Sequence, residues 1–142
     1  MNVSARNVFK GKISALVDGA VNAEVEIALA GGDKLVAIVT EGSVKSLDLA
    51  VGKDVVAYVK APWVIVLTGV SGVRFSARNQ LPGKVSALQK GAVNTEVAIT
   101  LDGGTVVYAV VTNEAVLELG LSIGAEASAL IKASHVILGV PA

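Results

Sequence analysis

The sequence predicts an all-β chain of two tandem OB-like barrels, each with five strands and one short helix. Two observations carry this prediction. The segment 4–68 recurs as 76–140 at a constant offset of 72 residues, with 31 identities in 65 positions. So much identity is far above chance and indicates a tandem duplication. Within each copy, apolar and polar residues alternate with the period of two that is typical of half-buried strands.

The elements of the first copy follow from this alternation and from the turn residues. Strands are expected at 8–17, 21–29, 35–40, 53–60 and 63–67. Asp18-Gly19 and Gly31-Gly32-Asp33 mark the turns, and Pro62 separates the last two strands. A short helix is predicted over 40–49 with Thr40 or Ser43 as its cap, and over 112–121 with Thr112 or Asn113 as its cap. A helix between the third and fourth of five strands is the element order of a small OB-like barrel.

Each copy is small for an independent domain. About 65 residues bury a small fraction of their surface, so such a domain is marginal alone. The chain has no cysteine, so no disulfide can compensate. We therefore expect the two copies to pack on each other, on other chains or on both.

The composition excludes several classes of function. Lys+Arg and Asp+Glu number 12 each, and a net charge of zero argues against a general nucleic-acid binder. Hydrophobic residues at 53% exclude disorder. One histidine and no cysteine cannot build a multi-histidine or thiolate metal centre, and five aromatic residues are few for base stacking. Neither a signal peptide nor an apolar run of membrane-spanning length is recognisable, so we expect a cytoplasmic protein without a membrane partner.

The sequence offers no catalytic constellation. It contains neither a phosphate-binding glycine loop with its lysine nor a nucleophile elbow. The carboxylates at matched positions, Glu24/Glu96 and Asp54/Glu126, are expected on solvated strand faces. His135 has no counterpart, because Trp63 holds its place in the first copy, and a packing or surface role is expected for it. We therefore predict that the protein is not an enzyme.

The two copies share a set of hydrogen-bond donors instead. Each keeps an arginine in a Ser-Ala-Arg-Asn box, a threonine before the helix and a Lys-Ala pair before the last strand. If these groups converge, they suit a small tetrahedral dianion. Structural interpretations remain open for each: a salt bridge for the arginines, a snorkelling strand end for the lysines, a cap for the threonines. Asn22 and Asn94 follow a hairpin turn and serve either the turn or an interface.

Four motifs in this order resemble a known module. They are Ser-Ala-Arg-Asn, Gly-Lys-Ile/Val-Ser-Ala-Leu, Gly-Ala-Val-Asn-x-Glu-Val and Lys-Ala-Pro-Trp-Val-Ile. Together they resemble the molybdate-binding Mop module, and two modules in one chain resemble the two-module molbindins. The modules would span 1–69 and 73–142. Similar modules occur on molybdate-responsive transcription regulators and importer ATPases, and no segment of either kind is recognisable here.

The resemblance implies an OB-like barrel for each module, a homotrimer of two-module chains, and molybdate or tungstate held between modules. It implies one class of molybdate site formed by Ser4, Arg6, Thr40, Ser43, Lys60, Ala61, Ser76, Arg78, Thr112, Lys132, Ala133 and Ser134. Because Ala115 replaces Ser43 and Ser134 replaces Pro62, the two modules' sites can be unequal. A second class near the threefold axis would use Val21, Asn22, Val93 and Asn94. No free metal cation is expected.

The donor chemistry fits this ligand. Molybdate is fully deprotonated near neutral pH, so it only accepts hydrogen bonds, and an all-donor site would penalise hydrogen phosphate. Sulfate would be excluded by pocket size alone. The leading hypothesis is therefore molybdenum storage and homeostasis. The alternatives are a regulatory module that signals anion level to a partner protein and an OB-type binder of single-stranded nucleic acid.

Overall fold

The computed structural model describes residues 2–69 and 72–141. Each repeat forms the predicted elements within a residue or two, except that α1 ends three residues before the predicted end of the helix, and the last strand is shorter and follows a 3₁₀ turn. The first repeat comprises β1 (Asn7–Asp18), β2 (Asn22–Leu29), the 3₁₀ turn η1 (Ala30–Gly32), β3 (Lys34–Thr40), α1 (Glu41–Ser46), β4 (Asp54–Val59), η2 (Ala61–Trp63) and β5 (Ile65–Leu67). The second comprises β6 (Asn79–Lys90), β7 (Asn94–Leu101), β8 (Val106–Thr112), α2 (Asn113–Leu119), β9 (Glu126–Ile131), η3 (Ala133–His135) and β10 (Ile137–Gly139).

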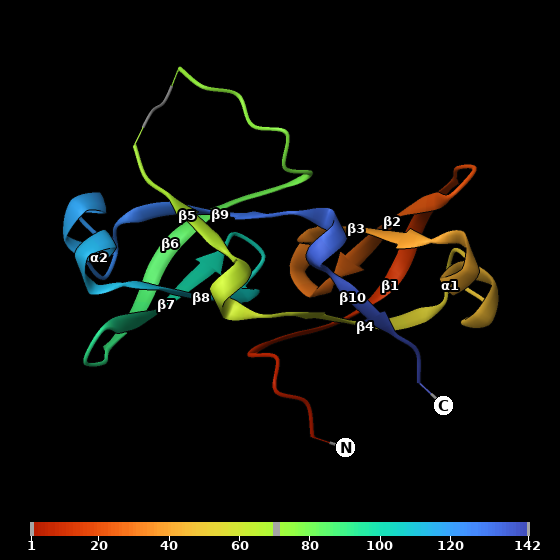
Figure 1. The fold of residues 1–142 in the computed structure, drawn as a ribbon, viewed down its shortest axis with the longest axis horizontal. Coiled ribbons are helices and arrows are strands. Elements are labelled where there is room, and N and C mark those ends of the chain that lie inside the picture. The colour runs from red at the N-terminus through yellow and green to blue at the C-terminus, as the bar shows by residue number, and fades with distance from the viewer. Residues whose placement is uncertain (1, 70–71, 142) are drawn as a thin grey trace.

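The two repeats exchange their last strands. The strands form two five-stranded antiparallel sheets in the orders β10-β4-β1-β2-β3 and β5-β9-β6-β7-β8. Ile137 of β10 pairs with Tyr58 of β4, and Ile65 of β5 pairs with Leu130 of β9. Figure 1 shows both crossings at the middle of an elongated molecule, with α1 and α2 at its opposite ends. Each barrel is therefore completed by a strand from the other repeat.

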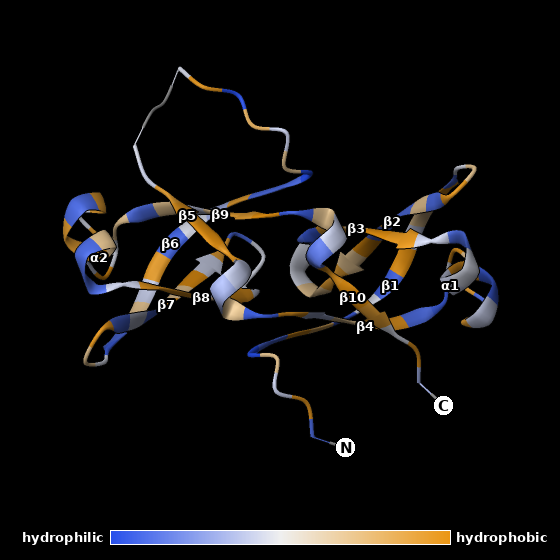
Figure 2. Cartoon of the chain, in the orientation of Figure 1, coloured by the Kyte–Doolittle hydropathy of each residue, from blue (hydrophilic) through white to orange (hydrophobic). Residues whose placement is uncertain are grey.

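The period-two pattern places one face of each strand in the core, as predicted. Val25 and Ile27 of β2 are fully buried, and so are Val97 and Ile99 of β7. The buried residues of both sheets form one connected cluster, so the repeats do pack on each other. Figure 2 shows that the exchanged strands β5 and β10 are hydrophobic along most of their length. Leu138 of β10 is buried in the first sheet, so the exchanged strand contributes to that core.

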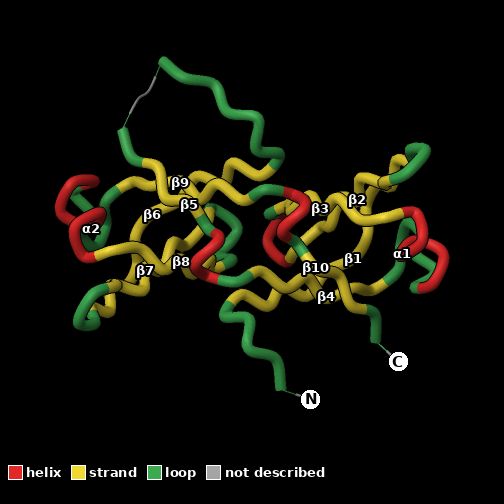
Figure 3. Tube along the Cα trace, in the orientation of Figure 1, coloured by secondary structure: helices red, strands yellow, loops and turns green. Residues whose placement is uncertain are grey.

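The two α-helices begin where the sequence predicts. The Oγ1 atom of Thr40 accepts a hydrogen bond of 3.1 Å from the backbone N–H of Ser43, and Thr112 does the same for Ala115. These bonds satisfy N–H groups that the first turn leaves unpaired. Asn113 is not the cap. Its side chain bonds Thr95 and the carbonyl of Gly91 instead. Figure 3 shows both capped helices at the ends of the molecule and the 3₁₀ turns near its centre.

We call the contact region between the two repeats the seam. Side chains of each repeat form hydrogen bonds there to backbone groups of the other. The amide of Asn7 donates to the carbonyl of Tyr108 at 2.8 Å and accepts from its N–H at 2.7 Å. Asn79 makes the same two bonds to Val36 at 2.8 and 2.7 Å. Both asparagines are buried. The last residue of each Ser-Ala-Arg-Asn box therefore fixes its repeat to the third strand of the other.

A close approach of two glycines completes this seam. Gly31 has φ +77°, and a Cβ atom there would lie 1.9 Å from the carbonyl oxygen of Gly103. Asp33 accepts hydrogen bonds from the N–H groups of Gly103 and Thr105 at 3.0 and 3.2 Å. The two loops therefore meet backbone to backbone, which only glycine allows at position 31.

Gly31→Ala is expected to lower the free energy of unfolding by about 2–5 kcal/mol, since it adds a clash at the seam to the strain of a left-handed backbone. Gly32→Ala is the matched control. Gly32 has φ +92°, but a Cβ there meets nothing within 4 Å, so that variant carries backbone strain alone. Urea denaturation of both variants measures the difference. Equal losses of stability would show that the approach of Gly31 to Gly103 contributes nothing.

Candidate oxyanion site

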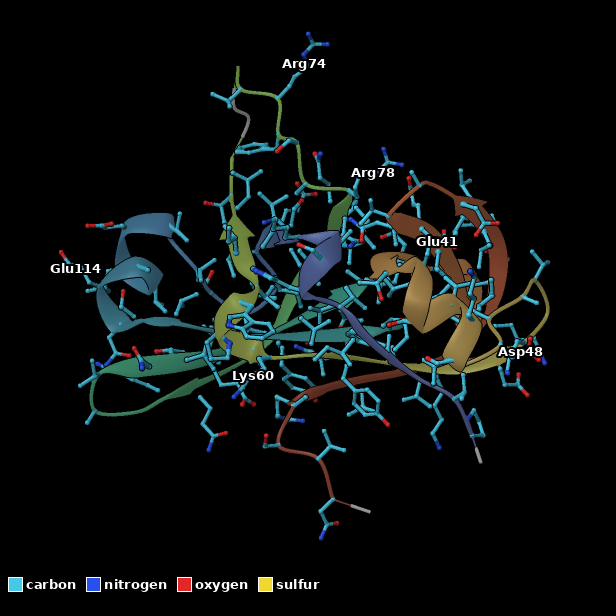
Figure 4. All side chains as sticks on the ribbon, turned by 45° about the vertical axis from the view of Figure 1, so that its right-hand side comes forward. Glu41, Asp48, Lys60, Arg74, Arg78 and Glu114 are labelled. Carbon is cyan, nitrogen blue, oxygen red and sulfur yellow. The ribbon has the colours of Figure 1, made fainter. Side chains whose placement is uncertain are left out.

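Strand pairing places each arginine box beside a lysine of the same repeat. Asn7 pairs with Val59, and Asn79 pairs with Ile131. Because these pairs are antiparallel, the preceding Arg6 and Arg78 adjoin the Lys60 and Lys132 that follow the partner strands. Both lysine side chains are exposed. Figure 4 shows Lys60 near the middle of the molecule and Arg78 projecting over the half that carries Glu41.

Five of the predicted residues line one cavity of about 380 Å³. They are Ser76, Arg78, Lys132, Ala133 and Ser134. The remaining lining is apolar. It comprises Ile38 of β3, Ile65 of β5, Leu130 of β9, and Phe75 and Ala77, which precede β6. Arg78 and Lys132 supply charged donors, and the two serines supply hydroxyl donors. This lining can hold a small oxyanion against an apolar wall.

The threonine that lies near this cavity comes from the other repeat. Thr40 follows Ile38 by two residues on the same face of β3, about 7 Å further along the strand. Asn22 of β2 pairs directly with Thr40. In the other half, η2 packs against β8, which ends at Thr112. The predicted residues therefore assemble across the repeats rather than within one.

Two donor sets result from this assembly, and each combines both repeats. The Arg78 set comprises Ser76, Arg78, Lys132, Ala133 and Ser134 with Thr40 and Ser43 beside them. The Arg6 set comprises Arg6, Lys60 and Ala61 with Thr112 beside them, and the predicted Ser4 precedes Arg6 by two residues. Ser43 is the clearest difference between the threonine regions. Its hydroxyl lies 2.9 Å from that of Thr40, and Ala115 offers no such group.

Each arginine is also held by a glutamate of the other repeat. The Nε of Arg6 lies 3.3 Å from both carboxylate oxygens of Glu96. A terminal nitrogen of Arg78 donates to the carboxylate of Glu24. Glu24 and Glu96 keep 34% and 30% of their side chains exposed, in accord with the solvated strand face predicted for them, and each also has an ion-pair partner in the other repeat that the sequence did not indicate. The salt bridge considered for the arginines does form, and it crosses the seam.

The residues assigned to the axial class lie at the tips of two hairpins. Val21 and Val93 are 73% and 70% exposed. Their carbonyls accept from the first N–H groups of α1 and α2, both at 2.9 Å. The carbonyls of Asn22 and Asn94 close the turns by accepting from Gly19 and Gly91, while both residues stay exposed. The backbone of both asparagines therefore closes the turns, and the residues remain exposed.

His135 packs against Trp63 across the seam, as the packing interpretation predicted. The two ring centroids are 5.0 Å apart with an interplanar angle of 39°. The Nδ1 atom of His135 is buried without a hydrogen-bond partner. Within residues 2–69 and 72–141, no three His, Cys, Asp or Glu side chains are grouped as metal ligands would be. No helix in the same part of the chain is long and apolar enough to cross a membrane.

A family comparison agrees with this duplicated architecture. The TOBE domain model matches residues 3–66 and again residues 76–138. The chain therefore belongs to the TOBE-domain family, with two copies of the domain.

Of the three similar proteins described next, two carry molybdate or molybdenum in their names. A solved structure of the cytoplasmic molybdate-binding protein ModG with molybdate bound is 64% identical, with a TM-score of 0.94 over 99% of this chain and 100% of that chain. The molybdenum-pterin-binding protein MopA of Rhodobacter capsulatus is 43% identical over 99% of this chain and 53% of its own length. The DNA-binding transcriptional dual regulator ModE of Escherichia coli is 37% identical over 97% of this chain and 52% of its own length. The chain thus spans about half the length of these two curated relatives.

Proposed function

We propose that this protein binds molybdate, and tungstate by the same geometry, for molybdenum storage and homeostasis in the cytoplasm. The observation that carries the proposal is the 64% identity to ModG, which extends over the whole of that chain. Similarity at this level supports the same ligand as well as the same fold. The role is that of a binding protein and not of an enzyme.

The donor sets supply the chemistry for this ligand. Each set joins an arginine and a lysine to hydroxyl groups, and all of these can donate to an anion that only accepts. The glutamate paired with each arginine offsets one positive charge, so each set carries a net local charge of about +1. Binding then depends on directed hydrogen bonds rather than on a general positive field, in accord with the chain's net charge of zero.

We further propose that three chains assemble around the axial residues. Val21 and Val93 at the hairpin tips are exposed, and so are Ile65 and Ile137, which are 63% and 60% exposed on the exchanged strands. Apolar residues that protrude at hairpin tips and on outer strands favour contact with further copies. The exposed mouth of the Arg78 cavity would then face a neighbouring chain. Light scattering coupled to size exclusion tests the trimer.

Removal of both arginines is the direct test of the site. Arg6→Ala plus Arg78→Ala is expected to weaken molybdate binding at least about tenfold, since each arginine contributes charge-assisted bonds. Equilibrium dialysis with excess sulfate and phosphate, followed by molybdenum analysis, measures what each chain retains. Arg74→Ala plus Lys90→Ala is the matched control, because it removes the same charge from exposed positions outside both sets. Unchanged binding in the arginine variant would exclude these sets as the site.

The similarity to ModE supports a second candidate, a module that reports the anion level to a partner. This role would use the same binding chemistry, so only the partner distinguishes it. A pull-down with and without molybdate tests for a ligand-dependent partner. Absence of oligonucleotide binding at low salt would exclude direct action on nucleic acid.

A further inference from the structure

We infer that the two donor sets of one chain differ in affinity and that Tyr108 makes the Arg6 set the tighter one. This inference rests on the proposed function and deepens it. Tyr108 is a positioning residue, since it acts on the anion only through Arg6.

Arg6 is held from two sides. Its guanidinium carbon lies 3.5 Å from the centroid of the Tyr108 ring, which is a close cation–π contact. Glu96 holds the Nε atom with both oxygens at 3.3 Å. The backbone of Tyr108 is held by both hydrogen bonds to the buried Asn7. Two contacts therefore restrain the guanidinium of Arg6.

Within the part of the chain that the structure describes, the cation–π contact of Arg6 has no counterpart at Arg78. The residue at the position equivalent to Tyr108, 72 residues earlier, is Val36. The backbone around it is arranged in the same way, since Asn79 makes the same two bonds to Val36. The aliphatic side chain of Val36 cannot form a cation–π contact. The difference between the two arginine environments therefore lies in one side chain.

The ion pairs of the two arginines also favour the Arg6 set. Glu96 engages Arg6 through Nε. Glu24 engages Arg78 through a terminal nitrogen. An anion that binds this terminal nitrogen of Arg78 must share or displace the carboxylate, whereas the observed contact of Glu96 uses the Nε atom of Arg6. A donor that is already oriented and unobstructed binds its ligand with less loss of entropy.

The test compares the two sets in the full chain, and binding that remains in the Arg6→Ala plus Arg78→Ala variant is subtracted as that of any axial sites. Arg78→Ala leaves the Arg6 set, and Arg6→Ala leaves the Arg78 set. Equilibrium dialysis against molybdate is expected to give tighter binding for the first variant. Adding Tyr108→Val to Arg78→Ala should weaken binding about two- to fivefold, which is the range for a cation–π contact at a partly exposed site. Tyr108→Phe keeps the ring and should retain the affinity.

Two controls separate positioning from a general loss of structure. Tyr108→Val in the Arg6→Ala background should leave the Arg78 set unchanged, with a similar thermal midpoint in both backgrounds. Val36→Tyr in that background should strengthen the Arg78 set. Equal affinities for the two single-arginine variants, or equal losses with Tyr108→Val and Tyr108→Phe, would overturn the inference. Failure of the wild-type protein to retain molybdate would instead overturn the proposed function.

Discussion

A chain shortened to end at residue 135 is expected to lose the ordered edge of the sheet formed by the first repeat. The deletion removes β10, which pairs with β4. Val136 and Leu138 are 3% and 8% exposed, and loss of two such side chains removes about 4–6 kcal/mol of stability. Since a small domain has about 5–15 kcal/mol in total, much of the shortened protein would be partly unfolded.

Hydrogen exchange followed by mass spectrometry can locate this effect. Protection should fall first in β4 and β1 of the first repeat, and less in β6 and β9 of the second, although the deleted residues belong to the second. Leu138→Ala should produce a milder form of the same pattern. Ile137→Ala is the matched control, because this neighbouring side chain is 60% exposed. Loss of protection confined to the second repeat would contradict the exchange of strands.

The sequence predicted the elements well because the signals for them are local. Alternation marked the strands, and Thr40 and Thr112 marked the helix starts. The exchange of β5 and β10 was not predictable in this way. The two repeats are so alike that β5 can complete either sheet with similar side chains, and the pattern of 63–67 is the same in both arrangements. The choice depends on the path through η2 and η3, which no periodicity reveals.

In the candidate site, too, local features were predictable from the sequence and contacts between the repeats were not. The sequence identified the arginines and the lysines because they recur between copies, and it identified the cavity-lining Ser134 as the residue that replaces Pro62. It missed the cross-repeat grouping of Thr40 with Arg78, and it missed Tyr108. Glu24 and Glu96 also recur in both copies, and that repetition was the available signal for a paired role. A carboxylate's partner some fifty to ninety residues away leaves no trace in the local pattern.

The Ser-Ala-Arg-Asn box combines two roles that identity between copies cannot separate. Arg6 and Arg78 belong to the donor sets, whereas Asn7 and Asn79 are 1% and 2% exposed and bond backbone across the seam. Each amide accepts from an N–H and donates to a carbonyl at once. Among side chains of this size, only a protonated carboxylic acid can do the same. The box therefore couples the ligand donors to the interface between repeats.

Asn7→Ala is accordingly expected to lower the free energy of unfolding by about 2–5 kcal/mol, because it leaves the N–H and carbonyl of Tyr108 without partners. Asn79→Ala should lose at least as much, since Asn79 also donates to the carbonyl of Ile131 at 3.2 Å. Urea denaturation measures both, and Asn2→Ala at an exposed position is the control.

Asn7→Asp separates hydrogen bonding from packing, since it keeps the shape and the acceptor but opposes a carboxylate to the carbonyl of Tyr108. A large loss of stability in Asn7→Asp at neutral pH would show that this buried position requires a neutral group that donates to the carbonyl of Tyr108. A loss in Asn7→Ala alone would assign it to packing. In the first of these two outcomes, the Ser-Ala-Arg-Asn box is kept in both repeats for two reasons. Its arginine belongs to a donor set, and its asparagine stabilises the seam, where Arg6 contacts Tyr108.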